Sequence, residues 1–297
     1  MLSPDLFRAA MQLIDRADEV LVVSHRRPDG DAIGSTVAVL ATLEGRGNRA
    51  WGLLLDPVPM RYRSLIANGR IEIEIWSQGF DPGRIDRAGA IVLLDASSWE
   101  QLDVVREPLS RAADRLVVVD HHETHDGLSP VELIDPTAAA TGLIIYEWFK
   151  FLKLDFPPVA REAIFAALAT DTGWFRFSNT DARALRAAAE LVQMGVEVHR
   201  CYEAIYWSES PARLALMAKA LAGMTLHLDG RLAVMQIDQA CLSECQAGQS
   251  DTEDLINEPM RIASVAVSAL LVEEPTGRIR VSLRSKRGVS VATVAEM

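Results

Sequence analysis

"VLVVSHRRPDGDAIGSTVAVLATLEG" (residues 20–45) joins a short apolar run, a polar loop and a longer apolar segment. The run at 20–24 is continuous, which predicts a strand that is buried on both faces. Pro28 and Gly30 are typical of a turn or loop. The apolar residues from 33 onward have helical spacing. A strand, a loop and a helix in this order are typical of a parallel α/β sheet.

The same pattern continues along the first half of the chain. Continuous apolar runs at 50–55, 91–94 and 116–120 predict further buried strands, and a helix-like segment at 99–112 lies between two of them. The run at 71–76 alternates apolar and acidic residues, so we expect it nearer an edge of the sheet. The first half therefore predicts a mostly parallel sheet with helices on both sides.

The length and the patterning of the chain predict two domains. The 297 residues, 49% of them hydrophobic, are enough to bury two cores. We expect a first domain at 1–185, a helical linker at 186–222 and a smaller α/β domain at 223–297. The linker has no strand pattern, whereas Asp229-Gly230 lies between two strand-like runs and predicts a two-residue hairpin turn.

Composition excludes several classes of protein. The formal net charge of -11 disfavours a protein that follows long nucleic acid and favours a small anionic substrate. No apolar run approaches the ~20 residues that cross a bilayer, and the N-terminal segment lacks the features of a signal peptide, so we expect a cytoplasmic protein. The three cysteines have neither zinc-site nor disulfide-framework spacing.

Potential metal ligands follow several of the predicted strands. The carboxyl ends of parallel strands share one edge of a sheet, where ligands bind. Each residue alone could be a helix cap or a turn residue, but together they would repel one another without cations. The set consists of His25, Asp29 and Asp31 after the first run, Asp95 after 91–94, Asp120, His121 and His122 at 116–122, and Asp171 at the end of a predicted helix.

The types of ligand narrow the choice of metal. Carboxylate oxygens and imidazole nitrogens without thiolates suit Mn²⁺ or Mg²⁺, while Co²⁺ and Zn²⁺ are also compatible. Four Asp and two His are too many for one ion and suit two. Two ions about 3.5–4 Å apart are typical of phosphoester hydrolysis. Asp56, Asp135 and His125 are predicted not to be ligands.

Four segments in order resemble the motifs of the DHH phosphoesterase family. They are "HRRPDGDAIGS" (25–35), "VLLDASS" (92–98), "VVVDHHETHDG" (117–127) and "ATDTGWFRFSNT" (169–180). "DTEDLIN" (251–257) and "RIRVSLRSK" (278–286) resemble the DHH-associated C-terminal domain. The combination is most similar to the branch of nanoRNases (oligoribonucleases) and pAp phosphatases, where pAp is 3′-phosphoadenosine 5′-phosphate. The resemblance implies that 1–185 is a DHH catalytic domain.

The resemblance implies a role for each predicted residue. The ligands would be His25 and Asp29 for one Mn²⁺, Asp31, His121 and Asp171 for the other, and Asp95 between the two. Asp120 would orient His121, while His122 would face the scissile phosphate. A hydroxide held between the ions would be the nucleophile.

The second domain would bind substrate. The resemblance implies that Arg284 contacts a substrate phosphate, and Ser282 and Lys286 would share its face of a strand. The family's second domain continues into a Gly-rich loop that ends in His, and this sequence stops at Met297, before that loop. Residues 289–297 have the pattern of a helix that is beginning.

These expectations favour a Mn²⁺-dependent phosphodiesterase, an exonuclease that cuts very short oligoribonucleotides and dinucleotides to mononucleotides. Mg²⁺ or Co²⁺ could replace Mn²⁺. The alternatives are a pAp phosphatase, a cyclic-dinucleotide phosphodiesterase, a long-strand exonuclease and a nucleotide-binding module that is inactive because of its early C-terminus. The expected partners are short oligoribonucleotides or small phosphorylated nucleotides, and neither long duplexes nor membranes. The oligomeric state, including a homodimer, is open.

Overall fold

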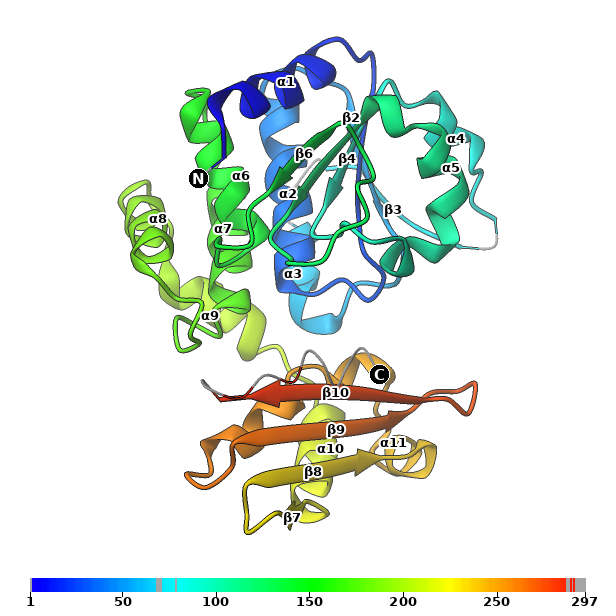
Figure 1. Ribbon diagram of the computed structural model, residues 1–297, viewed down its shortest axis with the longest axis vertical. Coiled ribbons are helices and arrows are strands. Elements are labelled where there is room, and N and C mark those ends of the chain that lie inside the picture. Colours follow the sequence, from blue (N-terminus) through cyan, green and yellow to red (C-terminus); the bar gives the residue numbers. More distant parts are fainter. Residues whose placement is uncertain (1, 68–70, 78, 287–288, 290, 292–297) are drawn as a thin grey trace. The chain divides into compact units, whose positions relative to one another are not determined.

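The computed structural model describes residues 2–67, 71–77, 79–286, 289 and 291. It divides into two compact units, Met1–Trp207 and Ser208–Met297, and each has its own sheet (Figure 1). The division lies within the segment that was predicted to be the linker. Most of the helix predicted at 289–297 falls outside the described residues. Within the described ranges, every helix is too short or too polar to cross a bilayer.

A six-stranded parallel sheet forms the centre of the first unit, in agreement with the predicted fold class. The strand order is β3-β2-β1-β4-β5-β6, so β3 lies at an edge, as its alternating sequence predicted. All neighbouring strands pair in parallel. The strands are β1 (Val20–Ser24), β2 (Ala50–Leu54), β3 (Ile73–Ile75), β4 (Ala90–Leu94), β5 (Leu116–Asp120) and β6 (Val131–Ile134).

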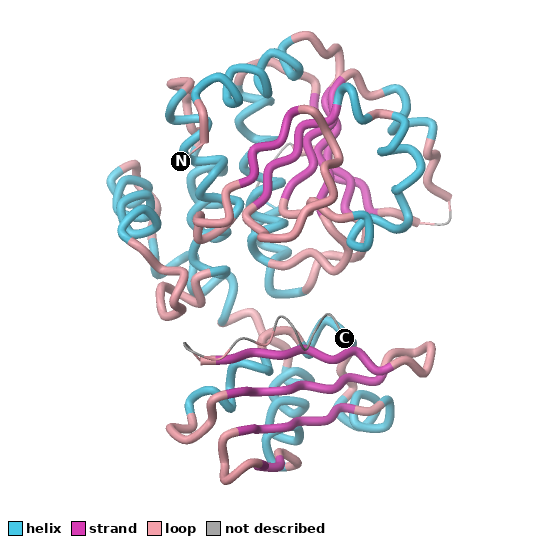
Figure 2. Tube along the Cα trace, in the orientation of Figure 1, coloured by secondary structure: helices cyan, strands magenta, loops and turns pink. Residues whose placement is uncertain are grey.

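Helices cover both faces of this sheet (Figure 2). Val20 and Val22 of β1 pack in a core with α1 (Pro4–Asp15), α2 (Gly30–Gly45), α6 (Thr141–Phe151), α7 (Pro158–Asp171) and α8 (Ala182–Gln193). Leu21 and Val23 pack on the opposite face with α4 (Gly83–Arg87), the 3₁₀ segment η2 (Trp99–Val105) and α5 (Arg106–Arg111). The alternation of side chains along a strand explains why the continuous run serves two cores.

Helices α2 and α7 make an unusually close contact. A Cβ added at Gly30 would lie 2.4 Å from Thr170 Oγ1, and one added at Gly34 would lie 2.5 Å from the carbonyl oxygen of Ala163. Only glycine leaves room for this approach. It brings the start of α2 next to the end of α7, where Asp171 lies.

One helical prediction needs correction. The segment 99–112 forms η2 followed by the short α5 instead of one helix, because Leu102 has a non-helical φ of -125°. Helix α9 (Val198–Tyr206) lies within the segment predicted to be a helical linker, although no separate helix was predicted at these residues. The remaining short helical segments of this unit are α3 (Arg63–Ala67), η1 (Met60–Tyr62) and η3 (Ala113–Arg115).

The second unit has a four-stranded sheet in the order β10-β9-β8-β7. Its strands are β7 (Thr225–His227), β8 (Leu232–Ile237), β9 (Val267–Glu273) and β10 (Ile279–Ser285), and its helical segments are α10 (Pro211–Ala222), α11 (Gln239–Cys245), η4 (Gln249–Thr252) and η5 (Leu255–Arg261). The predicted β7–β8 hairpin is confirmed, but its connection has four residues instead of two. Three of these, Leu228, Asp229 and Gly230, have positive φ.

Candidate metal centre

Three neighbouring strands of the first unit deliver the predicted site to one edge. From β1 the strands β2 and β3 follow toward one edge of the sheet, and from β4 the strands β5 and β6 follow toward the opposite edge. Ser24 pairs with Leu94, and Leu94 pairs with Val119, so the residues that follow these strands meet. This reversal of strand order is where ligands bind in open α/β sheets.

His25 faces the centre through Nε2. Its Nδ1 donates to the carbonyl oxygen of Arg26 at 2.7 Å, which leaves Nε2 3.3 Å from Asp95 Oδ2. Such a hydrogen bond at the distal nitrogen fixes the ring orientation that a metal-binding histidine requires.

Asp29 is a helix cap as well as a candidate ligand. Its Oδ1 accepts hydrogen bonds from the backbone nitrogens of Asp31 at 2.9 Å and Ala32 at 3.0 Å. Helix α2 therefore begins at Gly30, several residues earlier than its apolar spacing indicated. Asp29 also belongs to the cluster with His25 and Asp95.

Asp31 is buried between two helices. Its Oδ2 accepts from the backbone nitrogen of Thr141 at 2.6 Å, and its Oδ1 accepts from Gly142 at 2.9 Å and from Ser35 Oγ at 3.0 Å. The N-terminus of α6 thus binds this carboxylate as it would bind any anion. Two of the three donors are backbone groups, so the position of the carboxylate is fixed by the fold.

Asp95 occupies the middle of the cluster. Its backbone has the left-handed φ of 57°, and its N–H donates to Val119 of the neighbouring strand at 2.9 Å. The side chain is buried, and its Oδ1 accepts from Thr141 Oγ1 at 3.0 Å. Asp95 Oδ1 also lies 3.6 Å from His121 Nε2, while Oδ2 faces His25.

Asp120 holds His122 instead of His121, which corrects the role implied by the resemblance. Asp120 Oδ1 accepts from the ring Nδ1 of His122 at 2.6 Å, and Ser97 Oγ donates to Oδ2. His121 is oriented by the carbonyl oxygen of Ala138, 3.3 Å from its Nδ1. The His122 side chain is 45% exposed, and its Nε2 is not the nitrogen that bonds to Asp120.

Asp171 closes the cluster from α7. Its Oδ2 lies 3.8 Å from His121 Nε2. Asn179 Nδ2 lies 3.3 Å from the same oxygen and 3.0 Å from the carbonyl oxygen of Ala139, so it ties α7 to the loop before α6.

The residues form three groups that could each hold a cation, with their ligand atoms within 4.8 Å of one another. The groups are His25, Asp29 and Asp95; Asp31, His121 and Asp171; and Asp95, His121 and His122. The first group joins Asp95 to the predicted pair of His25 and Asp29, and the second contains the predicted Asp31, His121 and Asp171 without Asp95. Their oxygen and imidazole donors suit the harder divalent cations, and every predicted ligand belongs to at least one group.

Protonation equilibria show the electrostatic strain that a cation would relieve. Burial, reinforced by the charges of Asp95, Asp171 and Asp29, raises the pKa of Asp31 well above its usual range. Burial alone would lower the pKa of His25, but the hydrogen bond and charge of Asp95 outweigh it and raise that pKa to about 10. Like charges in a buried site disfavour ionisation, and a metal ion reverses this preference.

We expect Asp171→Asn to stabilise the metal-free protein. Burial and the charges of Asp29 and Asp95 outweigh the attraction of His121 and raise the pKa of Asp171 to about 7, above the unfolded value of about 3.9. Ionising this carboxyl therefore costs stability, and the cost grows as pH rises from about 4 to 7 and is complete above that range. At pH 8 in chelator, the variant should melt on the order of 2–4 °C above the parent. The gain should vanish near pH 4.

Differential scanning calorimetry with and without Mn²⁺ would test this expectation. Mn²⁺ should raise the melting temperature of the parent more than that of the variant, because a ligand is lost. Asp155→Asn is the matched control, since the Asp155 side chain is 96% exposed. A variant that is less stable than the parent in chelator at pH 8 would contradict the repulsion that we describe.

The three predicted non-ligands have other partners. Asp56 accepts from Arg26 and from the backbone of Arg27, and Asp135 accepts from Arg183. His125 Nδ1 lies 3.7 Å from Glu132.

The predicted substrate-binding residues lie on β10 or directly after it in the second unit. Ser282 pairs with Leu270 and Arg284 pairs with Ser268 of β9. Strand alternation puts both side chains on one face of the sheet, and the Arg284 side chain is exposed. Lys286 Nζ donates to the carbonyl oxygens of Ile262 at 2.8 Å and Ala263 at 3.2 Å.

Residues that position the ligands were not predicted. They are Ser35, Ser97, Ala138, Thr141, Gly142 and Asn179. The run of small residues before Thr141 was a usable signal, because a polar residue at the start of a predicted helix can bind an anion. For Ser97 and Asn179, no spacing rule predicts the contact.

Comparison with known proteins gives a consistent result. Residues 19–170 match the family model described as DHH family, N-terminal domain. The bifunctional oligoribonuclease and PAP phosphatase NrnA of Thermus thermophilus is 27% identical over 276 residues, covering 93% of this chain and 79% of that protein. The cyclic-di-AMP phosphodiesterase GdpP of Geobacillus thermodenitrificans is 22% identical over 299 residues, 97% of this chain but 44% of that protein. The solved structure of an exopolyphosphatase-related protein from Bacteroides fragilis has the same fold, with a TM-score of 0.89, 23% identity and coverage of 99% and 86%.

Proposed function

We propose, from the premise that this chain belongs to the DHH family, that it is a metal-dependent phosphoesterase that cuts very short oligoribonucleotides, dinucleotides included, to mononucleotides. One observation carries the proposal. The group of His25, Asp29 and Asp95 and the group of Asp31, His121 and Asp171 lie at the same sheet edge, and Asp95 contacts both histidines. Two adjacent sets of oxygen and nitrogen ligands are what phosphoryl hydrolysis by two cations requires.

We assign two Mn²⁺ ions to these sets, with Mg²⁺ or Co²⁺ as substitutes, because the donors include imidazole as well as carboxylate. When bound, the cations supply a nucleophile at neutral pH and neutralise charge on the phosphoryl oxygens. The fold supplies the ligand positions in advance: the start of α6 fixes Asp31 and the end of β4 fixes Asp95.

His122 acts on the leaving group in this proposal. Asp120 accepts the Nδ1 proton of His122, so a second proton on Nε2 points away from this carboxylate. His122 can then donate to the oxygen that leaves the phosphorus. Ser97 and the backbone N–H of His121 fix Asp120 in turn.

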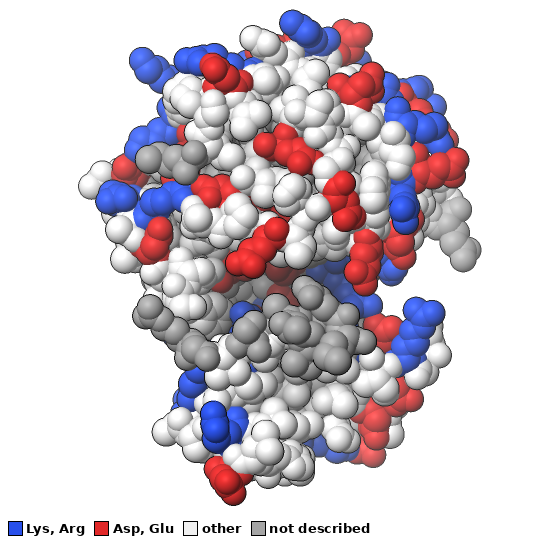
Figure 3. Space-filling model, in the orientation of Figure 1, with Lys and Arg blue, Asp and Glu red and all other residues white. Residues whose placement is uncertain are grey.

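Charge supports a small substrate. The chain carries a net charge of -11, and acidic and basic side chains are interspersed over the face of the first unit drawn in Figure 3. Long nucleic acid would meet repulsion at many acidic side chains, whereas a dinucleotide needs few contacts. We propose that Arg284 of the second unit contacts a phosphate of this substrate.

A second candidate activity has specific support. The relative from Thermus thermophilus is named both oligoribonuclease and PAP phosphatase, so removal of the 3′-phosphate from pAp is the next candidate for the same site. The similarity to a named cyclic-di-AMP phosphodiesterase keeps cyclic dinucleotides as a third.

The experiment that tests the function is a substrate panel with Mn²⁺, read by chromatography of products. It should contain pApA, pAp, cyclic di-AMP and a long single-stranded RNA. We expect pApA to give AMP with the highest kcat/KM. Intact pApA beside cleaved pAp or cyclic di-AMP would reassign the substrate. Arg284→Ala in the same panel should raise KM for pApA, whereas Arg261→Ala, an exposed arginine of the same unit, should not.

A further inference from the structure

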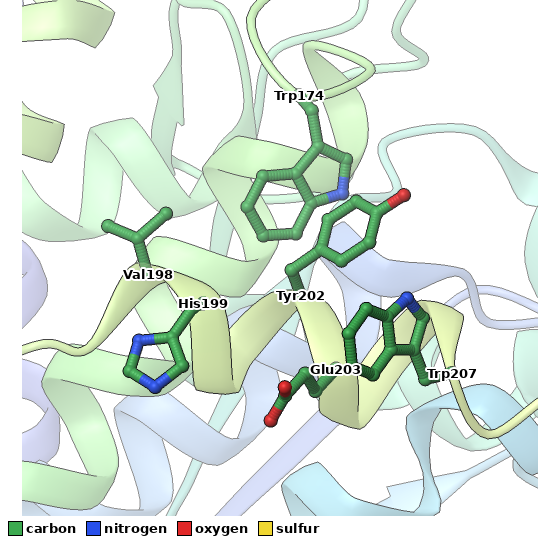
Figure 4. Close-up of a pocket in the computed structure, with 6 residues that line it drawn as sticks. All are labelled: Trp174, Val198, His199, Tyr202, Glu203 and Trp207. Carbon is green, nitrogen blue, oxygen red and sulfur yellow. The ribbon is translucent and has the colours of Figure 1, made fainter.

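A pocket of about 520 Å³ lies wholly within the first unit, beside helix α9. Its volume is within the range of small-molecule sites. Five of its residues come from α9 or its end and one from the turn after α7, as Figure 4 shows. The lining residues are Trp174, Val198, His199, Tyr202, Glu203 and Trp207.

Aromatic rings with exposed surface dominate this pocket. The side chain of Trp207 is 73% exposed and that of Tyr202 is 40% exposed. Trp174 meets Tyr202 edge to face at 5.0 Å, and Tyr202 stacks on Tyr206 at 5.0 Å. The guanidinium of Arg61 lies 5.0 Å from the centre of the Tyr206 ring. The aromatic rings therefore support one another and are held in place by Arg61.

The turn that carries Trp174 is held in an unfavourable conformation. Trp174 and Phe175 both have left-handed φ, 57° and 61°. A bulky residue rarely adopts this region, and such strain collects at functional sites. The turn is fixed by the backbone bond from Trp174 to Ala169 and by the edge contact of the Trp174 ring with Phe165.

The same turn links the pocket to the candidate metal centre. Trp174 follows Asp171 by three residues, which span at most roughly 10 Å of chain. A phosphate held by a cation at Asp171 would therefore lie close along the chain to the Trp174 backbone, and the ribose and base would extend from it toward the aromatic rings. Glu203 adds a carboxylate to the lining, a group that accepts hydrogen bonds from the amino groups of bases.

We propose that this pocket binds a nucleobase of the nucleotide whose phosphate lies at the metal centre. The inference rests on the proposed function and extends it to base recognition. Flat aromatic faces stack any base, and the Glu203 carboxylate favours bases with an exocyclic amine, adenine above uracil. The substrate is thus held by its base as well as by its phosphates.

Calorimetric titration with AMP and with ribose 5-phosphate, in the presence of Mn²⁺, tests the pocket without requiring turnover. Trp207→Ala should weaken AMP binding about tenfold, the usual loss for one stacked base, and leave ribose 5-phosphate unchanged. Trp207→Phe should restore most of the affinity. Because Trp207 is exposed, its replacement should not impair folding, and equal melting temperatures of the parent and the variant would verify this.

Leu228→Ala is the matched control, because Leu228 is 72% exposed and lies in the second unit. It should bind AMP as the parent does. Unchanged AMP affinity in Trp207→Ala would overturn the proposal, as would equal weakening of AMP and ribose 5-phosphate. A change in oligomeric state without a change in AMP affinity would also overturn it and make the pocket a contact between copies of the chain.

These outcomes separate the pocket from the function. If the parent leaves pApA intact but binds AMP through Trp207, the proposed activity fails and the pocket stands. If pApA is hydrolysed and Trp207→Ala has the parental KM and AMP affinity, the activity stands and the pocket fails.

Discussion

Asp95→Asn should lower kcat for pApA hydrolysis by at least about 10³-fold, because we propose that this residue lies between the two cations. Its two oxygens face different histidines, His25 at 3.3 Å and His121 at 3.6 Å. The amide retains an oxygen for Thr141 Oγ1 but lacks the negative charge that two bound cations would share. Asparagine is preferable to alanine here, since it tolerates the left-handed φ of 57°.

The number of bound metal ions distinguishes loss of a proposed shared ligand from a local distortion. Calorimetric titration of the parent with Mn²⁺ should give two ions per chain, and the variant should bind fewer and more weakly. Asp56→Asn is the matched control. Asp56 also follows a strand of the sheet, β2, but it bonds to Arg26 and Arg27 and is not a predicted metal ligand. Near-parental activity of Asp95→Asn would refute the two-cation assignment.

The sequence predicted the architecture well because the strands of a parallel sheet are buried on both faces. A continuous apolar run satisfies this requirement, and few other local sequence patterns do so. The residue that follows each run then lies at the ligand-binding edge, which is why His25, Asp95 and His121 could be brought together without a structure. The alternating run of β3 also correctly indicated an edge strand.

Features that depend on side-chain direction could not be predicted in this way. The adjacent histidines His121 and His122 both follow β5, and only the backbone path decides that Asp120 meets the ring of His122. Asp29 is both a helix cap and a candidate ligand, whereas the residue spacing alone presents these two roles as alternatives. The apolar residues of α9 recur at helical spacing and were a usable signal for a helix, but its aromatic residues gain meaning only when Trp174 packs against them.

His122→Ala should lower kcat for pApA by about 10²–10³-fold while both cations remain bound, because proton donation by a positioned side chain contributes this much. The Nδ1 of His122 bonds to Asp120 at 2.6 Å, and the side chain is half-exposed, so we propose that Nε2 faces the substrate. The ribose oxygen that leaves from pApA is a strong base and needs a proton. A p-nitrophenyl ester of a nucleoside monophosphate releases a weak base that does not. The variant should therefore lose far less activity on the ester than on the dinucleotide.

His125→Ala provides the control for this experiment, since His125 lies in the same loop and its side chain is 46% exposed, against 45% for His122. It should hydrolyse both substrates at the parental rate. Mn²⁺ titration should give the same stoichiometry for the parent and both variants. Equal losses on the two substrates in His122→Ala would mean that the imidazole stabilises charge on the phosphoryl group instead of donating a proton. Loss of a bound Mn²⁺ in His122→Ala would place this residue in the group that it forms with Asp95 and His121, as a ligand.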